Sequence, residues 1–243
     1  MKLAYDQKDI APTIAKILNL DYGVPSGESI EIKEKFVGKN VILAIIDSLD
    51  WFVYEKFGRN IIENIFDGSI IEFKISASAD KTSPSIATIL TGLDPEEHHV
   101  FSTQNAQESE IINLPEFAEK NGVKSTVVME KGGAMTFLKT LEAVTPVEDR
   151  EDIVEFDDDI LSGVEESADE FKFIVCHLRT LDEQLHRGET VEKIEECLER
   201  IIHKIINIAR EERFLLVITG DHKSHGNVFE GSDIVPLVFI EFR

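Results

Sequence analysis

Short apolar runs alternate along the chain with longer segments in which apolar residues recur every three or four positions. The clearest run lies at 40–47, and its unbroken apolar character is typical of a strand buried on both faces. Strands are expected at 40–47, 69–75, 124–130, 171–178, 213–221 and 234–242, and helices at 9–19, 50–65, 84–91, 113–121, 133–140, 158–169 and 188–211. This alternation predicts an α/β fold with a mostly parallel central sheet and helices on both faces.

Two helical segments show how the pattern is interpreted. The segment 188–211 carries apolar residues on one face and Glu and Lys on the other, which predicts a helix that covers the sheet. The acidic tract 147–170 is interpreted as a solvated helix and its connections rather than as a metal cage. Because no internal repeat or Pro- or Ser-rich linker divides the chain, residues 1–243 are expected to form a single domain.

Composition and charge exclude several classes of partner. The formal net charge of -22 argues against nucleic acid, since neutralising a phosphate backbone requires clustered Lys and Arg. No apolar run approaches the roughly 18–20 residues of a membrane span, and the N-terminus lacks the apolar core of a signal peptide. Cys176 and Cys197 lie in apolar patterns and form no disulfide framework. We therefore expect a cytoplasmic protein without membrane or nucleic-acid partners; the oligomeric state is not indicated.

Polar side chains that can bind metals follow several of the expected strands. They are Asp47, Thr82, Asp182, His186, Asp221, His222 and His225. Loops that follow parallel strands converge at the carboxyl edge of a sheet, so these residues can meet although they are far apart in sequence. Three carboxylates, three imidazoles and a hydroxyl suit two divalent ions, zinc or manganese, with an oxygen nucleophile between them.

Each of these residues also has an ordinary structural interpretation. An aspartate at the end of a strand, such as Asp47, is often a helix N-cap. Thr82 precedes Pro84 and is in place to cap the helix that starts there. Asp182 and His186 are spaced i, i+4, as in many salt links on helices.

The sequence segments around these candidate residues resemble motifs of the alkaline phosphatase superfamily, particularly of its phosphodiesterase/nucleotide pyrophosphatase and phosphoglycerate mutase-like branches. The matching blocks come in the family order: VILAIIDSL, TSPSIATILTGLDPEEHHV, HLRTLDEQLH, VITGDHKSHG and IVPLVFI. The resemblance implies an alkaline phosphatase-like three-layer fold. It also implies that Thr82 is the nucleophile, at the N-terminus of a helix that faces the bound phosphate.

The resemblance further implies the ligands of two metal ions. The first would be held by Asp182, His186 and His225, and the second by Asp47, Thr82, Asp221 and His222. The implied activity is hydrolysis of a small phosphomonoester or phosphodiester through a phosphothreonine intermediate. A sulfatase is excluded, because that activity needs a Cys or Ser that is oxidised to an aldehyde.

Departures from the family pattern keep a second interpretation open. Leu185 and Lys223 stand where the family motifs have glycine, which favours a catalytically degenerate domain that binds or regulates. His177 and Arg179 lie beside a metal block and are candidates for substrate contact.

The N-terminal segment 1–39 resembles a segment that family members carry near the C-terminus. The matching stretch is 9–30, in which an Asp-x-x-Pro-Thr pattern opens a helix. This order suggests a circular permutation in which the two chain ends lie adjacent at the sheet edge.

Overall fold

A seven-stranded sheet forms the centre of the molecule. The computed structural model describes residues 3–23, 25–66, 68–225, 229 and 231–242. The strands follow the order β2-β7-β6-β1-β5-β3-β4. Their bounds are β1 Val41–Ile46, β2 Gly68–Ser76, β3 Ser125–Glu130, β4 Thr145–Val147, β5 Phe173–Leu178, β6 Leu215–Gly220 and β7 Ile234–Phe242. β7 runs antiparallel to β2 and β6, whereas the other described pairs are parallel.

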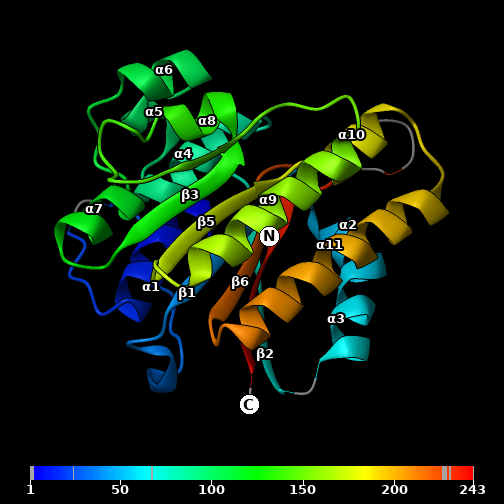
Figure 1. Ribbon diagram of the computed structural model, residues 1–243, viewed down its shortest axis with the longest axis horizontal. Coiled ribbons are helices and arrows are strands. Elements are labelled where there is room, and N and C mark those ends of the chain that lie inside the picture. The colour runs from blue at the N-terminus through cyan, green and yellow to red at the C-terminus, as the bar shows by residue number, and fades with distance from the viewer. Residues whose placement is uncertain (1–2, 24, 67, 226–228, 230, 243) are drawn as a thin grey trace.

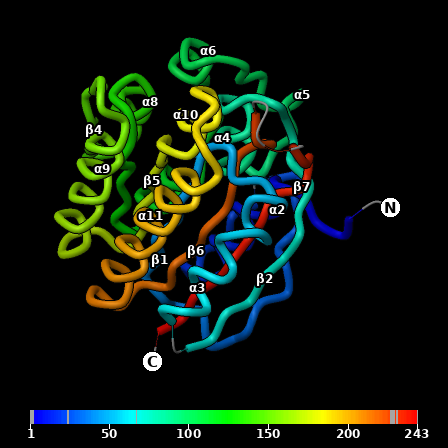
Figure 2. The backbone as a smooth tube through the Cα atoms, turned by 90° about the vertical axis from the view of Figure 1, so that its right-hand side faces the viewer, coloured from blue at the N-terminus to red at the C-terminus, as the bar shows by residue number. Residues whose placement is uncertain are grey.

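Helices cover both faces of the sheet (Figures 1 and 2). The α-helices are α1 Ile10–Ile17, α2 Trp51–Val53, α3 Arg59–Ile65, α4 Thr82–Thr91, α5 Pro95–His98, α6 Thr103–Glu108, α7 Leu114–Lys120, α8 Lys131–Met135, α9 Ile153–Ala168, α10 Thr180–His186 and α11 Val191–Glu211. The shorter turns are η1 Gln7–Asp9, η2 Glu34–Phe36 and η3 Tyr54–Gly58. No helix in the described ranges is long and apolar enough to cross a membrane.

Two hydrophobic cores, one on each face of the sheet, hold the three layers together. α2, α3, α9 and α11 pack on one face, against Ile42, Ala44 and Ile46 of β1. α1, α4 and α7 contribute to the core on the other face, with Val41, Leu43 and Ile45. All six residues of β1 are buried because the sheet is covered on both sides, which explains the unbroken apolar run in the sequence. The predicted α/β three-layer architecture is confirmed.

The element boundaries differ from the sequence prediction in a few places. The predicted helix at 158–169 starts earlier, at Ile153, because the Asp152 side chain accepts hydrogen bonds from the first free backbone N–H groups of α9. The predicted helix at 50–65 contains a π-helical turn, η3. The short edge strand β4 and the helices α5, α6 and α10 were not predicted, because segments of three to seven residues carry too little periodicity.

The described segments nearest to the two chain ends lie far apart. Asp6 forms a bridge with Ser76, at one end of the β2–β7 ladder. Phe242 pairs with Gly68, at the other end of the same nine-residue ladder, which is roughly 26 Å away at about 3.3 Å per residue. The expectation that the chain ends are adjacent is therefore wrong, because β7 carries the chain away from the edge where the N-terminal segment lies.

Candidate active site

The central strands β1 and β6 place acidic side chains side by side. Asp47 follows β1 directly, and Asp221 follows β6, its parallel neighbour. Gly220 permits this approach, since a Cβ at that position would lie 1.9 Å from the carbonyl oxygen of Leu49. The site thus forms at the carboxyl edge of the sheet, as the strand-end pattern predicted.

Three buried side-chain atoms converge there without a hydrogen-bond partner among the described residues. They are Asp47 Oδ1, His177 Nε2 and Asp221 Oδ2. One ligand atom from each residue lies within 4.8 Å of the others. Leaving buried polar groups unpaired is costly, so three such atoms together are suited to holding a cation. Two carboxylates and an imidazole are ligands that fit a zinc or manganese ion.

The carboxylates and imidazoles of the site shift one another's pKa values. The imidazole Nε2 atoms of His177 and His222 lie 3.4 and 3.1 Å from the Asp47 carboxylate. Burial opposes ionisation of Asp47, but the two facing imidazoles hold the pKa of its carboxyl below the ordinary value. Burial and the neighbouring Asp47 carboxylate raise the pKa of Asp221 to about 7. Burial disfavours the imidazolium of His222, yet Asp47 and Asp221 raise its pKa to about 9.

Thr82 does not cap its helix, so the structural interpretation of this residue as an N-cap is wrong. It is the first residue of α4, whose N-cap position is Lys81 and carries no side-chain capping bond. The Thr82 Oγ1 atom instead lies 3.3 Å from His222 Nε2. The hydroxyl therefore faces the cluster of Asp47, Asp221 and His222 with which the sequence grouped it.

The ligands predicted for the other metal lie beside this cluster. Asp182 and His186 approach each other to 3.4 Å across one turn of α10. The ring of His225 lies 4.8 Å from that of His222 and 5.6 Å from that of His186, measured between centroids. The structure therefore brings all seven predicted residues to one place, in two neighbouring groups, although their roles as ligands remain predictions.

Ser48 connects the two groups and was not anticipated from the sequence. Its backbone N–H donates to Asp221 Oδ1 at 3.0 Å, and its hydroxyl donates to Asp182 Oδ1 at 2.6 Å. Ser48 has a φ of 62°, a left-handed conformation that is unfavourable for a residue with a Cβ and that is concentrated at functional sites. This backbone turn directs both hydrogen-bond donors of Ser48 towards the carboxylates.

His177 is a candidate ligand that the sequence did not assign. Its buried imidazole lies with Asp47 and Asp221, and it also lines the cleft beside the site, so the predicted substrate contact stays a prediction. The sequence did carry a signal for the ligand role. His177 is the one histidine in the otherwise largely apolar run FKFIVCHL, and it lies one residue before the end of β5. Arg179, the other candidate for substrate contact, lines the cleft beside the site and pairs with Asp149 at 2.9 Å.

Two further buried carboxylates hold the loops that carry ligands. Asp157 of α9 accepts hydrogen bonds from the backbone N–H groups of Arg179 and Thr180, both at 2.9 Å, and so fixes the start of α10. Asp50 accepts from the N–H and hydroxyl of Ser224 and from the N–H of Ser232, and thereby holds Ser224, the neighbour of His225, in place. The acidic tract was interpreted as solvated, which is wrong for Asp157 because its carboxylate replaces a missing cap of α10.

Gln7 ties the N-terminal segment to the active site. Its side-chain amide donates to the carbonyl oxygens of Gly220 and Asp221, at 3.1 and 2.6 Å, and accepts from Ser78 N at 2.8 Å. Gln7 is completely buried, so it joins the end of β6 to the loop that precedes Thr82.

Replacing Gln7 by methionine is expected to lower the free energy of unfolding by about 2–4 kcal/mol, because it leaves buried backbone groups unpaired while nearly conserving volume. Urea denaturation measures this change. The matched variant Gln104→Met alters an exposed residue of α6 and should shift stability by less than about 0.5 kcal/mol. Equal urea midpoints for the two variants would show that the Gln7 hydrogen bonds contribute nothing net.

Comparisons with known proteins identify the fold. No protein-family model and no curated protein sequence matches the chain. Among solved structures, the C-terminal periplasmic domain of EptC from Escherichia coli, in complex with zinc, matches 84% of this chain and 73% of that domain, with 12% identity and a TM-score of 0.55. The murine ectonucleotide pyrophosphatase/phosphodiesterase 5 matches 76% of this chain and 57% of that protein, with 16% identity and a TM-score of 0.58.

A third similar structure covers nearly the whole chain. The lipoteichoic acid synthase LtaP from Listeria monocytogenes matches 96% of this chain and 71% of that protein, with 12% identity and a TM-score of 0.57. These proteins are members of the alkaline phosphatase superfamily. The chain therefore has the alkaline phosphatase fold, as its ordered sequence blocks predicted.

Proposed function

We propose that this protein is a metal-dependent phosphohydrolase that cleaves a small phosphomonoester or phosphodiester with Thr82 as nucleophile. The observation that carries the proposal is the convergence of unpaired ligand atoms from Asp47, His177 and Asp221 near the Thr82 hydroxyl. The solved structures with this fold are consistent with it, since they include a pyrophosphatase/phosphodiesterase and a phosphonoacetate hydrolase.

The residues of the chain would divide the reaction between them. Bound divalent ions would lower the pKa of the threonine hydroxyl and offset negative charge in the transition state. The Thr82 hydroxyl loses its proton and its oxygen forms a bond to phosphorus as the bond to the departing alcohol, which takes up a proton, breaks. Water then cleaves the bond between phosphorus and Thr82, which restores the hydroxyl and releases phosphate from a monoester or a phosphomonoester from a diester. The N-terminus of α4 directs backbone N–H groups towards the phosphate oxygens.

The residues that replace family glycines are accommodated by their surroundings. Leu185 is completely buried in the core beneath α10. Lys223 forms ion pairs with Asp80 and Asp233, at 3.1 and 3.5 Å. Because packing and ion pairing accept both side chains, they favour an active enzyme over a degenerate binding domain.

The direct test is hydrolysis of p-nitrophenyl phosphate and bis-p-nitrophenyl phosphate by protein dialysed against a chelator and then supplied with zinc or manganese. We expect activity only after metal is added, and the preferred ester would identify the substrate as monoester or diester. Absence of turnover with both esters and both metals, together with less than one bound metal per chain, would instead indicate the degenerate domain.

A further inference from the structure

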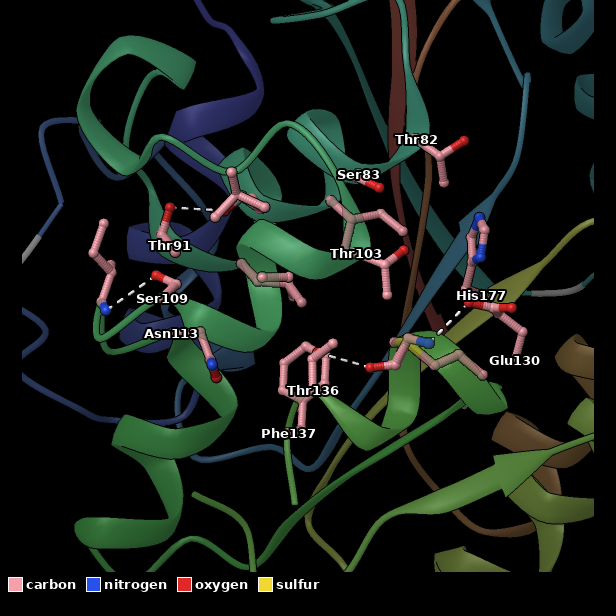
Figure 3. A pocket seen from close by; sticks show the side chains of 18 of the residues that line it. Thr82, Ser83, Thr91, Thr103, Ser109, Asn113, Glu130, Thr136, Phe137 and His177 are labelled. Carbon is pink, nitrogen blue, oxygen red and sulfur yellow. Dashed lines mark hydrogen bonds between the residues drawn. The ribbon is translucent and has the colours of Figure 1, made fainter. Parts of the chain in front are cut away.

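A cleft of about 650 Å³ extends from the candidate active site along α4. Thr82 and His177 lie at one end of it, and Thr91, Ser109 and Asn113 lie at the other (Figure 3). The volume falls within the range of about 300–1,000 Å³ that is usual for sites of small organic ligands. The cleft is therefore far larger than a phosphate group requires.

Apolar side chains form much of the cleft wall between its two ends, together with the hydroxyls of Thr103 and Thr136 (Figure 3). One side of α4 lines the cleft with residues at spacings i, i+3, i+4 and i+7, which are Ser83, Ile86, Ala87 and Leu90. An apolar helix face normally packs into a core, but this one borders a cleft and starts one residue after the proposed nucleophile.

Residues from other elements complete the apolar lining. They are Val100, Met129 of β3 and Phe137, which lies across the cleft from Thr82 (Figure 3). An organic group attached to a phosphate at Thr82 would therefore contact hydrocarbon from α4, β3 and Phe137 along much of its length, with the hydroxyls of Thr103 and Thr136 beside it.

The charged residues of the cleft disfavour an anionic occupant. Beyond the candidate metal ligands, the lining residues include the carboxylates of Glu108, Glu110 and Glu130, and that of Glu116, which pairs with Lys120 at 2.6 Å. The lining cations are Lys139 and Arg179. The ammonium of Lys139 donates to the carbonyl oxygens of Gln107 and Ser109 and keeps its charge, whereas Arg179 pairs with Asp149, so the carboxylates still outnumber the cations. A second negative group on the ligand would meet net negative charge.

We infer that this cleft binds the alcohol portion of the phosphate ester, and that this portion is an apolar group without negative charge. The inference rests on the proposed function, because Thr82 defines the end of the cleft where the phosphate lies. Esters of apolar alcohols are therefore the expected ligands. Nucleotide polyphosphates are not, because their additional phosphates would lie among the glutamates of the cleft.

Calorimetric titration with alkylphosphonates, which resist hydrolysis, tests the inference in the presence of zinc. Affinity should rise about threefold for each methylene, so hexylphosphonate should bind on the order of a hundredfold more tightly than methylphosphonate. 5-Carboxypentylphosphonate, of similar length with an anionic end, should lose most of that gain. Equal affinities for the three compounds would overturn the inference.

Variants locate the binding in the cleft. Ala87→Phe fills its middle and should reduce the ratio of hexyl to methyl affinity at least tenfold, whereas Ala143→Phe, at an exposed loop residue, should leave the ratio unchanged. Glu110→Lys changes an exposed lining residue and should selectively strengthen binding of the carboxylate compound, unlike Glu195→Lys on the exposed face of α11. If each variant behaves like its control, the ligands bind elsewhere and the inference fails.

Hydrolysis of p-nitrophenyl phosphate separates this inference from the proposed function. Turnover of that ester without any dependence of binding on chain length would retain the hydrolase and reject the apolar subsite. Chain-length-dependent binding without turnover of either p-nitrophenyl ester would reject the hydrolase and identify the cleft as a binding site for phosphorylated apolar ligands.

Discussion

Thr82→Ala is expected to lower kcat/KM for the preferred p-nitrophenyl ester on the order of 10³-fold or more. Removing the hydroxyl removes the attacking atom, and each tenfold loss corresponds to about 1.4 kcal/mol of transition-state stabilisation. Thr82→Ser keeps the oxygen and should retain activity within about two orders of magnitude of the wild type. Initial rates at saturating zinc or manganese measure both variants.

Two controls show whether the loss of activity in Thr82→Ala is due to the missing hydroxyl. One is a threonine variant away from the site, and the other is the metal content of Thr82→Ala itself. Thr145→Ala alters a residue of the edge strand β4 and should keep wild-type rates. Thr82→Ala should still bind metal through Asp47, Asp221 and the histidines, since their ligand atoms remain. If Thr82→Ala kept a tenth or more of the wild-type rate, a different nucleophile would have to be sought.

Metal binding is expected to raise the melting temperature of the protein by about 5–10 °C. A hundredfold excess of zinc or manganese over Kd stabilises the folded state by about 2.7 kcal/mol, and a chain of this size gains about 2–4 °C per kcal/mol. The physical source is the buried pair Asp47 and Asp221, whose unpaired oxygens gain a cation. Thermal melts with and without chelator measure the shift.

Asp221→Asn separates metal binding from the folding of the site. It removes one of two buried carboxylates that repel each other, so its metal-free form should melt at the wild-type temperature or above. The same change removes a ligand and should abolish most of the metal-induced shift. Asp169→Asn, at an exposed position, should leave both melting temperatures unchanged. An unaltered metal shift in Asp221→Asn would place the cation elsewhere.

Most of the candidate site could be predicted because its residues directly follow strands or lie in short motifs. Asp47 and the pair Asp221 and His222 end apolar runs, and Thr82 begins a helix, so local pattern located them. Their convergence follows from one general property, since parallel strands end at the same edge of the sheet.

The supporting residues could not be predicted, because their partners lie far away along the chain. Gln7 contacts Asp221 across 214 positions, and Ser48 contacts Asp182 across 134. A buried glutamine or serine has no periodicity or spacing that indicates such a partner. The left-handed turn at Ser48 also follows no glycine or asparagine signal in the sequence.

The sequence by itself determined the α/β class, the strands of the central sheet other than β4, and the candidate site residues, because apolar periodicity and strand-end motifs are local properties. Only the tertiary structure decided the separation of the chain ends, the place of His177 among the ligand atoms and the shape of the cleft. These depend on which side chains meet across elements. That pairing results from packing of the whole fold, which no short stretch of sequence encodes.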